Sequence, residues 1–158
     1  MTARRLGPVA RRMARLPGRL YDWRLGWLLG HRFLRLTHVG RRSGRRYRTV
    51  LEVVGPAGPG EVVVVAGFGR SADWFRNISA LPPIEVAIGR QRFRPVARVL
   101  PAEEAAAVLA DYERRNRLAG PVVRRVLGWL VGWEYDGSAA ARARLVQELP
   151  FVAFRRAE

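Results

Sequence analysis

The sequence contains no lysine and no cysteine among its 158 residues, and it has only two histidines. Without cysteine the chain can form neither a disulfide framework nor a thiolate metal site. The histidines, His31 and His38, show no metal-ligand spacing, so we expect no metal centre. The sequence also lacks an apolar run near the roughly 20 residues of a membrane-spanning helix, and it shows no signal peptide. These absences favour a cytoplasmic protein.

The positive charge of the chain comes from a single residue type. All 29 basic residues are arginine, and with 13 acidic residues they give a net charge of +16. Such a balance predicts an anionic partner, which is nucleic acid, an acidic lipid surface or a polyanionic small molecule. The alternative explanation is that a GC-rich genome fills the solvated surface with arginine without any functional reason. Because no recognisable nucleic-acid-binding motif is present, a nucleic-acid-binding module is the least favoured interpretation.

Residues 1–31 alternate arginines with apolar residues at close to the 3.6-residue period of a helix, interrupted at Pro17-Gly18. This pattern predicts a basic amphipathic helix that forms a segment of its own. The sequence LGWLLG at 25–30 returns as LGWLVG at 127–132. Either both segments pack on the core, or both place tryptophan and arginine against anionic lipid headgroups. Residues 1–31 are therefore a candidate anchor on the inner face of the membrane.

Short strands separated by turn residues occupy the middle of the chain. Strands are predicted at 33–39, 46–54, 61–66, 84–89, 92–100 and 150–155. The turn sequences GPAGPG at 55–60 and Gly89-Arg90 join neighbouring strands into hairpins. The hydrophobic content of 49% fits one globular domain.

Helices are predicted between and after these strands from capping and turn residues. The predicted helices are a short one capped by Ser71–Asp73 and ended by Pro82-Pro83, one from Pro101 to about 117, one from Gly120 to about Trp133, and one capped by Asp136–Ser138 and ending at Glu148. The fold class predicted is α+β. We expect a small antiparallel, partly closed β-barrel with flanking helices and an amino-terminal amphipathic helix.

The loop between the first two strands carries arginine on both sides of a serine. Gly40 and Gly44 bracket it, can take positive φ and let a ligand approach the main chain. The guanidinium groups, which match phosphate or carboxylate oxygens, belong to Arg41, Arg42, Arg45 and Arg46. The loop leads into a strand, so no helix dipole assists binding, and a Rossmann or P-loop site is disfavoured. The loop is predicted to bind an anion.

Three sequence blocks resemble the deazaflavin-dependent nitroreductase and quinone-reductase family of actinobacteria. The blocks are LTHVGRRSG from Leu36, VVVVAGFGRSADWFRNISALPP from Val62 and LPFVAFR from Leu149. The resemblance implies the split β-barrel of flavin-binding oxidoreductases for residues 32–158. The chain departs from the family in an extra helical segment, a predicted insertion at about 118–148. It also implies the deazaflavin coenzyme F420, with FMN as the alternative cofactor.

The coenzyme implied by the resemblance bears a phosphodiester and a glutamate tail, which need several fixed cations and close main-chain approach. The loop matches the family's phosphate-binding run, except that Tyr47 stands at a basic position of the family. The cofactor-binding residues implied are Gly40, Arg41, Arg42, Ser43, Gly44, Arg46, Arg48, Gly67, Gly69, Arg70, Trp74 and Asn77. The alternatives are a solvated basic hairpin loop and, for Trp74, a role as a core anchor.

Hydride transfer requires positioning and exclusion of water, and it needs no nucleophile or carboxylate pair. Tyr112 is the candidate proton donor, because the family has tyrosines in this region near its substrate pocket. Its spacing from Val108 and Leu109 places it on an apolar helix face, so packing in the core is the favoured interpretation. Tyr135 is a second candidate, and His38 is expected to be structural.

The resemblance implies an F420-dependent oxidoreductase that passes a hydride to a hydrophobic acceptor, such as a quinone, a nitroaromatic compound or an activated alkene. An acceptor held in lipid would explain the basic helix that contains tryptophan. The alternative is a non-catalytic flavin- or deazaflavin-binding protein of the same fold, because a fold alone does not decide activity.

Overall fold

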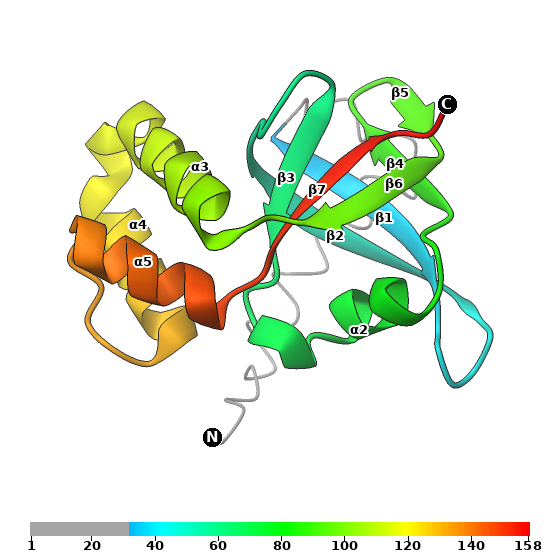
Figure 1. Ribbon diagram of the computed structural model, residues 1–158, viewed down its shortest axis with the longest axis horizontal. Helices are drawn as coiled ribbons and strands as arrows, with labels where there is room; N and C mark the ends of the chain where they lie inside the picture. The colour runs from blue at the N-terminus through cyan, green and yellow to red at the C-terminus, as the bar shows by residue number, and fades with distance from the viewer. Residues whose placement is uncertain (1–31) are drawn as a thin grey trace.

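The sheet of this protein curls into a partly closed barrel (Figure 1). The computed structural model describes residues 32–158, and the predicted helix at 1–31 lies outside the described residues. Within 32–158 the strands are β1 (Phe33–Val39), β2 (Arg46–Gly55), β3 (Glu61–Val65), β4 (Glu85–Ile88), β5 (Gln91–Phe93), β6 (Pro95–Val99) and β7 (Phe151–Arg156). Neighbours are antiparallel in the order β5-β4-β1-β2-β3-β7-β6. The predicted α+β barrel is confirmed.

Only Arg94 separates β5 from β6, so the two edge strands of the sheet are consecutive in the chain. The Arg94 carbonyl accepts a hydrogen bond of 2.8 Å from the Ala157 N–H, just after β7. The single strand expected over 92–100 is therefore wrong, because the chain leaves β4 and joins β7 at this point. Pro95 has no N–H and a fixed φ, which favours a break between the two strands there.

Helices cover one end and one side of the barrel (Figure 1). They are a 3₁₀ turn at Gly69–Ser71, α2 (Asp73–Ala80), α3 (Ala102–Arg115), a 3₁₀ turn at Arg117–Ala119, α4 (Gly120–Val131) and α5 (Ala139–Glu148). The predicted cap of α5 is confirmed, because the Ala141 N–H donates to Ser138 Oγ at 3.1 Å. The predicted cap of α2 is wrong. This helix follows Ala72 without a side-chain cap, and Ser71 Oγ donates to the Phe68 carbonyl at 3.0 Å.

Two apolar cores share the walls of the barrel. The interior core fills the barrel, and Trp74 and Phe75 of α2 close one end of it. The outer core lies between the barrel wall and the layer formed by α3, α4 and α5. Successive residues of β3 and β7 alternate between the cores, with Val63, Phe151 and Ala153 in the outer core and Val64, Val152 and Phe154 in the interior core. This alternation follows from the two-residue period of a strand.

Residues 118–148, expected as an insertion, form α4, α5 and their connections against the outer core. The Tyr135 hydroxyl donates to Glu113 of α3, and Arg142 of α5 lies 3.4 Å from the same carboxylate. Burial, and then the bond to Glu113, raise the pKa of Tyr135 above its ordinary value, so this hydroxyl keeps its proton. The expected division between 1–31 and 32–158 stays a prediction. Among the helices of the described chain, none combines the length and apolar character needed to cross a membrane.

Candidate functional site

Main-chain hydrogen bonds close the arginine-rich loop between β1 and β2. The Gly40 N–H donates to the Arg45 carbonyl at 2.8 Å, and the Gly44 N–H donates to the Gly40 carbonyl at 2.9 Å. Gly44 has the expected positive φ of 68°, which strains any other side chain. Gly40 does not take a positive φ, and glycine serves close packing there. A Cβ at Gly40 would lie 2.4 Å from Ser43 Oγ and 2.7 Å from Tyr47 Cε2.

Arg41 ties this loop to α2. Its main-chain N–H and its Nη1 donate to Asn77 Oδ1 at 3.1 and 2.8 Å. Its guanidinium also lies 3.4 Å from Asp73 Oδ1. The Arg41 side chain is only 19% exposed, so its guanidinium fixes the position of the loop. A direct contact between Arg41 and a bound anion stays a prediction.

The same hydrogen bonds continue to His38 and determine its tautomer. Because Arg41 offers only donors, the Asn77 oxygen faces Arg41 and the Asn77 Nδ2 donates to His38 Nδ1 at 3.1 Å. His38 therefore carries its proton on Nε2, which donates to Thr49 Oγ1 at 2.9 Å. This series of bonds runs in one direction and requires a neutral imidazole. It supports the structural role expected for His38.

Stability should fall in mild acid because of His38. Burial lowers the pKa of His38 below 6.5, although Asp73 opposes this shift. As the pH falls, His38 therefore takes up its proton in the unfolded chain before it does so in the folded protein. The stability that neutral His38 gives to the folded state is fully present above pH 6.5, and it is lost as the pH falls toward the folded-state pKa. The loss approaches about 1.4 kcal/mol per pH unit between the two pKa values. Thermal melts at several pH values should show this dependence in the wild type and not in His38→Gln, and equal dependence in both would contradict it.

The exposed cations between the two strands are Arg42 and Arg45, and Arg46, the first residue of β2, is exposed as well. Near them, Ser43 Oγ and the Tyr47 hydroxyl lie 3.1 Å apart, and the Arg45 N–H donates to Ser43 Oγ at 3.3 Å. Within residues 32–158, no partner accepts from the N–H groups of Arg42 and Ser43. Two guanidinium groups, two hydroxyls and two amides are thus gathered on one short loop. Tyr47 stands at a basic position of the family, and no local sequence pattern indicates that its hydroxyl bonds Ser43.

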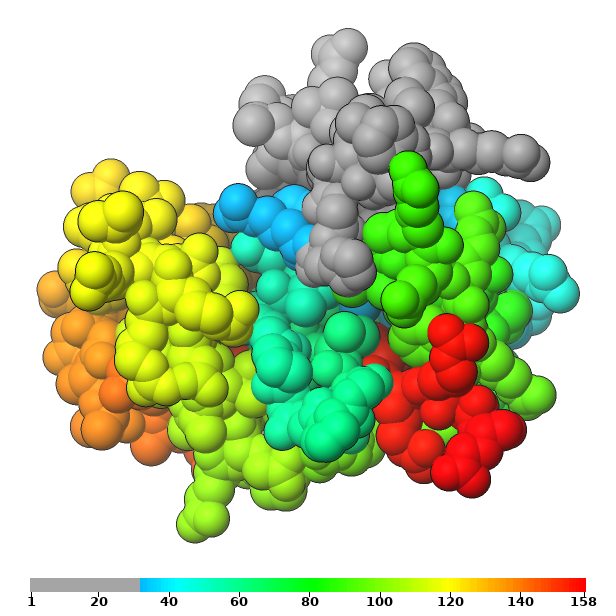
Figure 2. All heavy atoms as spheres, turned by 90° about the horizontal axis from the view of Figure 1, so that it is seen from above, coloured from blue at the N-terminus to red at the C-terminus, as the bar shows by residue number. Residues whose placement is uncertain are grey.

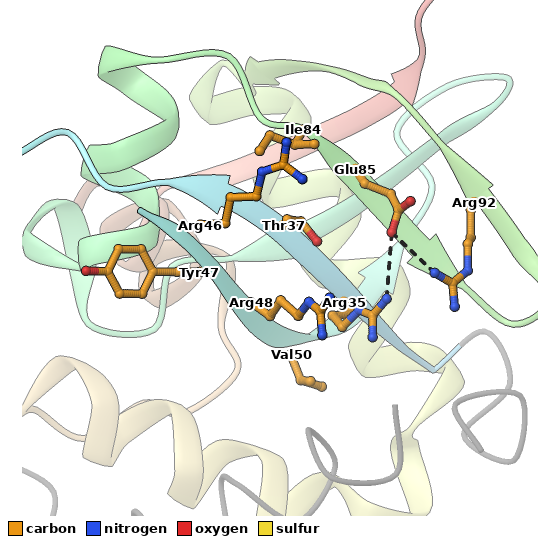
Figure 3. A pocket seen from close by; sticks show the side chains of 9 residues that line it. All are labelled: Arg35, Thr37, Arg46, Tyr47, Arg48, Val50, Ile84, Glu85 and Arg92. Carbon is orange, nitrogen blue, oxygen red and sulfur yellow. Dashed lines mark ion pairs between the residues drawn. The ribbon is translucent and has the colours of Figure 1, made fainter. Parts of the chain in front are cut away.

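Arg46 and Arg48 face a different side of the barrel from His38 and Thr49. Residues alternate along β2, so these arginines lie on the outer face, where Figure 3 shows both among the residues that line a pocket. A pocket of about 590 Å³ is formed there by Arg35, Thr37, Arg46, Tyr47, Arg48, Val50, Ile84, Glu85 and Arg92. The Glu85 carboxylate lies 3.7 Å from both Arg35 and Arg92. Four arginines and one glutamate leave this pocket positively charged.

The second block, from Val62 to Pro83, contains most of β3, the loop that precedes α2, and α2 itself. Gly69 has a positive φ of 73°, and a Cβ there would lie 3.4 Å from the Glu148 carbonyl oxygen of α5. A Cβ at Gly67 would lie 3.4 Å from Leu130 Cδ2 of α4. The helices of the 118–148 segment therefore lie directly against this loop. Arg70 is exposed beside it, whereas Trp74 is buried in the interior core, as its alternative role as a core anchor requires.

Tyr112 lies between α3 and the outer face of β2. Its hydroxyl donates to Glu52 Oε1 at 3.0 Å, and its ring packs against the outer core. Burial, followed by the charge of Glu52, raises the pKa of Tyr112 to about 12. Tyr112 therefore has a hydrogen-bond partner, Glu52, on the outer face of β2, whereas Thr49 lies on the opposite face. A role for Tyr112 in catalysis stays a prediction.

Comparison with protein families decides the wider identity. A sequence model described as F420H2-dependent quinone reductase matches residues 19–120, which include both loops, α2 and most of the barrel. The chain belongs to this family. It is an F420-dependent oxidoreductase, and the resemblance noted in the sequence is confirmed.

The solved structures that match this chain do so at low sequence identity. An F420-H2 dependent reductase, FDR-A, is 19% identical with a TM-score of 0.45, over 80% of this chain and 96% of that one. The haem storage protein HutZ from Vibrio cholerae is 13% identical with a TM-score of 0.47, over 88% of this chain and 91% of that one. Comparison with curated proteins gave no match.

The residues around the 40–46 loop fit the coenzyme of the family. Guanidinium forks, hydroxyls and main-chain amides are the donors that bind phosphate oxygens. Asp73, the carboxylate that contacts this loop, is paired with Arg41, which offsets its repulsion of an anion at Arg42 and Arg45. The outer pocket begins where the loop ends, at Arg46, and its arginines suit carboxylates. The donor chemistry of both places matches a phosphodiester that carries a glutamate tail.

Proposed function

We propose that this F420-dependent oxidoreductase binds the anionic tail of its coenzyme at the 40–46 loop and reduces an apolar acceptor. The acceptor classes are a quinone, a nitroaromatic compound and an activated alkene. When bound, reduced F420 supplies the hydride. The observation that carries the proposal is the fixed loop itself, in which Arg41 is held by Asn77 and Asp73 while Arg42 and Arg45 stay exposed.

Each part of the proposed site has its own task. Arg42 and Arg45, with the Ser43 hydroxyl, bind the phosphodiester, and Arg46 and Arg48 meet the glutamate carboxylates. The series of hydrogen bonds from Arg41 to Thr49 keeps the loop in place, so little order has to be gained on binding. These residues bind and position, which is what hydride transfer asks of the protein.

The loop before α2 is the proposed acceptor side of the site. Phe68 lies between Gly67 and Gly69, which pack against α4 and α5, and its side chain is 51% exposed. An exposed phenyl ring offers an apolar surface to a flat, apolar acceptor. Arg70 lies next to this ring in the sequence and is itself exposed. The loop thus offers an apolar contact with a cation close by.

Tyr112 has a packing role in this proposal. Tyr112→Phe keeps the ring and removes one hydrogen bond to a half-exposed Glu52, so it should cost about 1 kcal/mol of stability or less. A proton donor lost from the reacting centre would instead lower turnover by about 10²-fold or more. The two roles are therefore separable with one variant.

The test combines the full chain, reduced F420 and a water-soluble quinone, and follows oxidation of the coenzyme by its absorbance. We expect turnover at closely similar rates in the wild type and Tyr112→Phe. Coenzyme binding without oxidation by any of the three acceptor classes would identify a carrier protein instead. A folded Tyr112→Phe variant that binds the coenzyme but has lost at least about 10²-fold in rate would make Tyr112 the proton donor.

A further inference from the structure

The helix α4 and the turn before it carry an uncovered apolar stripe. Leu118, Val122, Val126 and Trp129 are 96%, 65%, 50% and 44% exposed. No residue of α4 is fully buried. In Figure 2 the yellow atoms near residue 120 form an edge of the molecule that no other coloured segment covers in that view.

Helical spacing places these four residues together. Their intervals of four, four and three residues keep them within about 80° of one another around a helix axis. Leu127 and Leu130 lie on a different side of the same helix and pack against the outer core. The stripe, defined here as Leu118, Val122, Val126 and Trp129, is therefore a second apolar face. Nothing in the packing of the described chain accounts for it.

Arginines outnumber acidic residues beside the stripe, although Glu134 and Asp136 line a groove with Arg124 and Arg125. From Arg114 to Trp133 the sequence contains five arginines and no acidic residue. Arg124 and Arg125 are exposed on α4 itself, and Arg117 is exposed in the turn before it. A helix with apolar residues on one side, arginines beside them and tryptophan in the stripe has the composition of a helix that lies in the plane of a membrane surface.

We infer that the stripe on α4 docks on an anionic lipid surface. Two copies meeting through this face would bring like-charged arginines together, because a symmetric contact repeats the same patch on both sides. An anionic leaflet offers both partners at once, since it takes the apolar side chains and attracts the arginines. Charge complementarity thus favours lipid over a second copy of the chain.

The position of α4 links this surface to the proposed site. Leu130 Cδ2 of α4 lies 3.4 Å from the place of a Cβ on Gly67, in the loop before α2. Docking through α4 therefore brings that loop close to the lipid, from which an apolar acceptor can enter. Only this link rests on the proposed function. The docking itself is measured without turnover.

The absence of native cysteine allows a direct test with single labels in the full chain. Val126→Cys and Val99→Cys form a matched pair, because the two valines are 50% and 49% exposed and Val99 lies on β6. Each variant carries an environment-sensitive fluorophore and is mixed with phosphatidylglycerol or phosphatidylcholine vesicles. We expect a blue shift, with quenching by lipids labelled in their acyl chains, only at position 126 and only with phosphatidylglycerol.

Other outcomes overturn the inference. No shift at position 126, or equal shifts at both positions, would remove α4 from the contact. A shift at 126 that grows with protein concentration in the absence of vesicles would assign the stripe to a second copy of the chain.

A second pair of variants measures how much the stripe contributes. Leu118→Ser/Val122→Ser should weaken partition onto phosphatidylglycerol vesicles at least tenfold, while Val96→Ser/Val99→Ser should change it less than twofold. Both pairs should keep their turnover with a water-soluble quinone. Unchanged partition of the first pair would mean that other residues bind the lipid. Arg42→Ala/Arg45→Ala should partition nearly as the wild type does, so loss of coenzyme binding and loss of docking are distinguishable.

Discussion

Asn77→Ala is expected to lower the free energy of unfolding by about 2–4 kcal/mol, or roughly 5–15 °C in melting temperature. Asn77 is 5% exposed and bonds the Arg41 N–H, the Arg41 guanidinium and His38 Nδ1. Alanine leaves the buried His38 nitrogen and the Arg41 amide without this partner, and each such group costs about 1–3 kcal/mol. Chemical denaturation followed by circular dichroism measures the loss.

Asn77→Asp is the informative counterpart. Its carboxylate still accepts from Arg41, but it presents an acceptor to His38 Nδ1, which must then carry a proton. The pKa of His38 should therefore rise above 6.5 in this variant, although it lies below 6.5 in the wild type. Ring NMR signals report both values, and the chain has only two histidines to assign. An unchanged His38 pKa, or a loss of less than about 1 kcal/mol in Asn77→Ala, would contradict the described series of bonds.

Much of the barrel was open to prediction because local patterns determine it. The strand at 33–39 was bounded correctly, and the Ser138 cap and Gly44 followed from the chemistry of caps and turns. The break at Arg94 was not predicted, because the change of partner strand from β4 to β7 is not a local property of the sequence.

The sequence predicted which residues belong to the candidate site, but not how they contact one another in space. The spacing of arginine and glycine predicted an anion-binding loop, but the bond from Arg41 to Asn77 joins positions 36 residues apart. No local pattern reveals such a pair. The predicted cofactor-binding residues included Arg42, Arg46 and Arg48 as one set. Strand alternation instead places Arg46 and Arg48 in the pocket on the outer face of β2.

Arg42→Ala/Arg45→Ala should weaken F420 binding about 10²-fold while leaving the melting temperature nearly unchanged. Each charge-assisted bond to phosphate contributes about 1.5–3 kcal/mol, and exposure to solvent reduces this to roughly tenfold for each arginine. Both side chains are exposed, so their loss should not disturb either core. Equilibrium titration followed by coenzyme fluorescence measures the affinity.

Two further double variants locate the parts of the coenzyme tail. Arg46→Ala/Arg48→Ala should weaken binding of the glutamylated coenzyme and leave binding of the form without glutamates nearly unchanged. Arg94→Ala/Arg155→Ala removes the same charge from two exposed arginines that line neither the 40–46 loop nor the outer pocket, and it should affect neither form by more than about twofold. Equal losses in all three double variants would show that net charge, rather than the loop, attracts the coenzyme.

The alternation of β3 and β7 between the two cores has a consequence for how errors in folding are avoided. If either strand slipped by one residue, Phe154 and Val64 would face the helical layer, and Ala153 and Val63 would face the barrel interior. The large side chains on opposite sides of β7 would then change places with small ones, leaving voids in one core and steric overlap in the other. A one-residue shift in register therefore destabilises the packing on both faces of the strand. The native pairing of β3 and β7 is favoured by both cores.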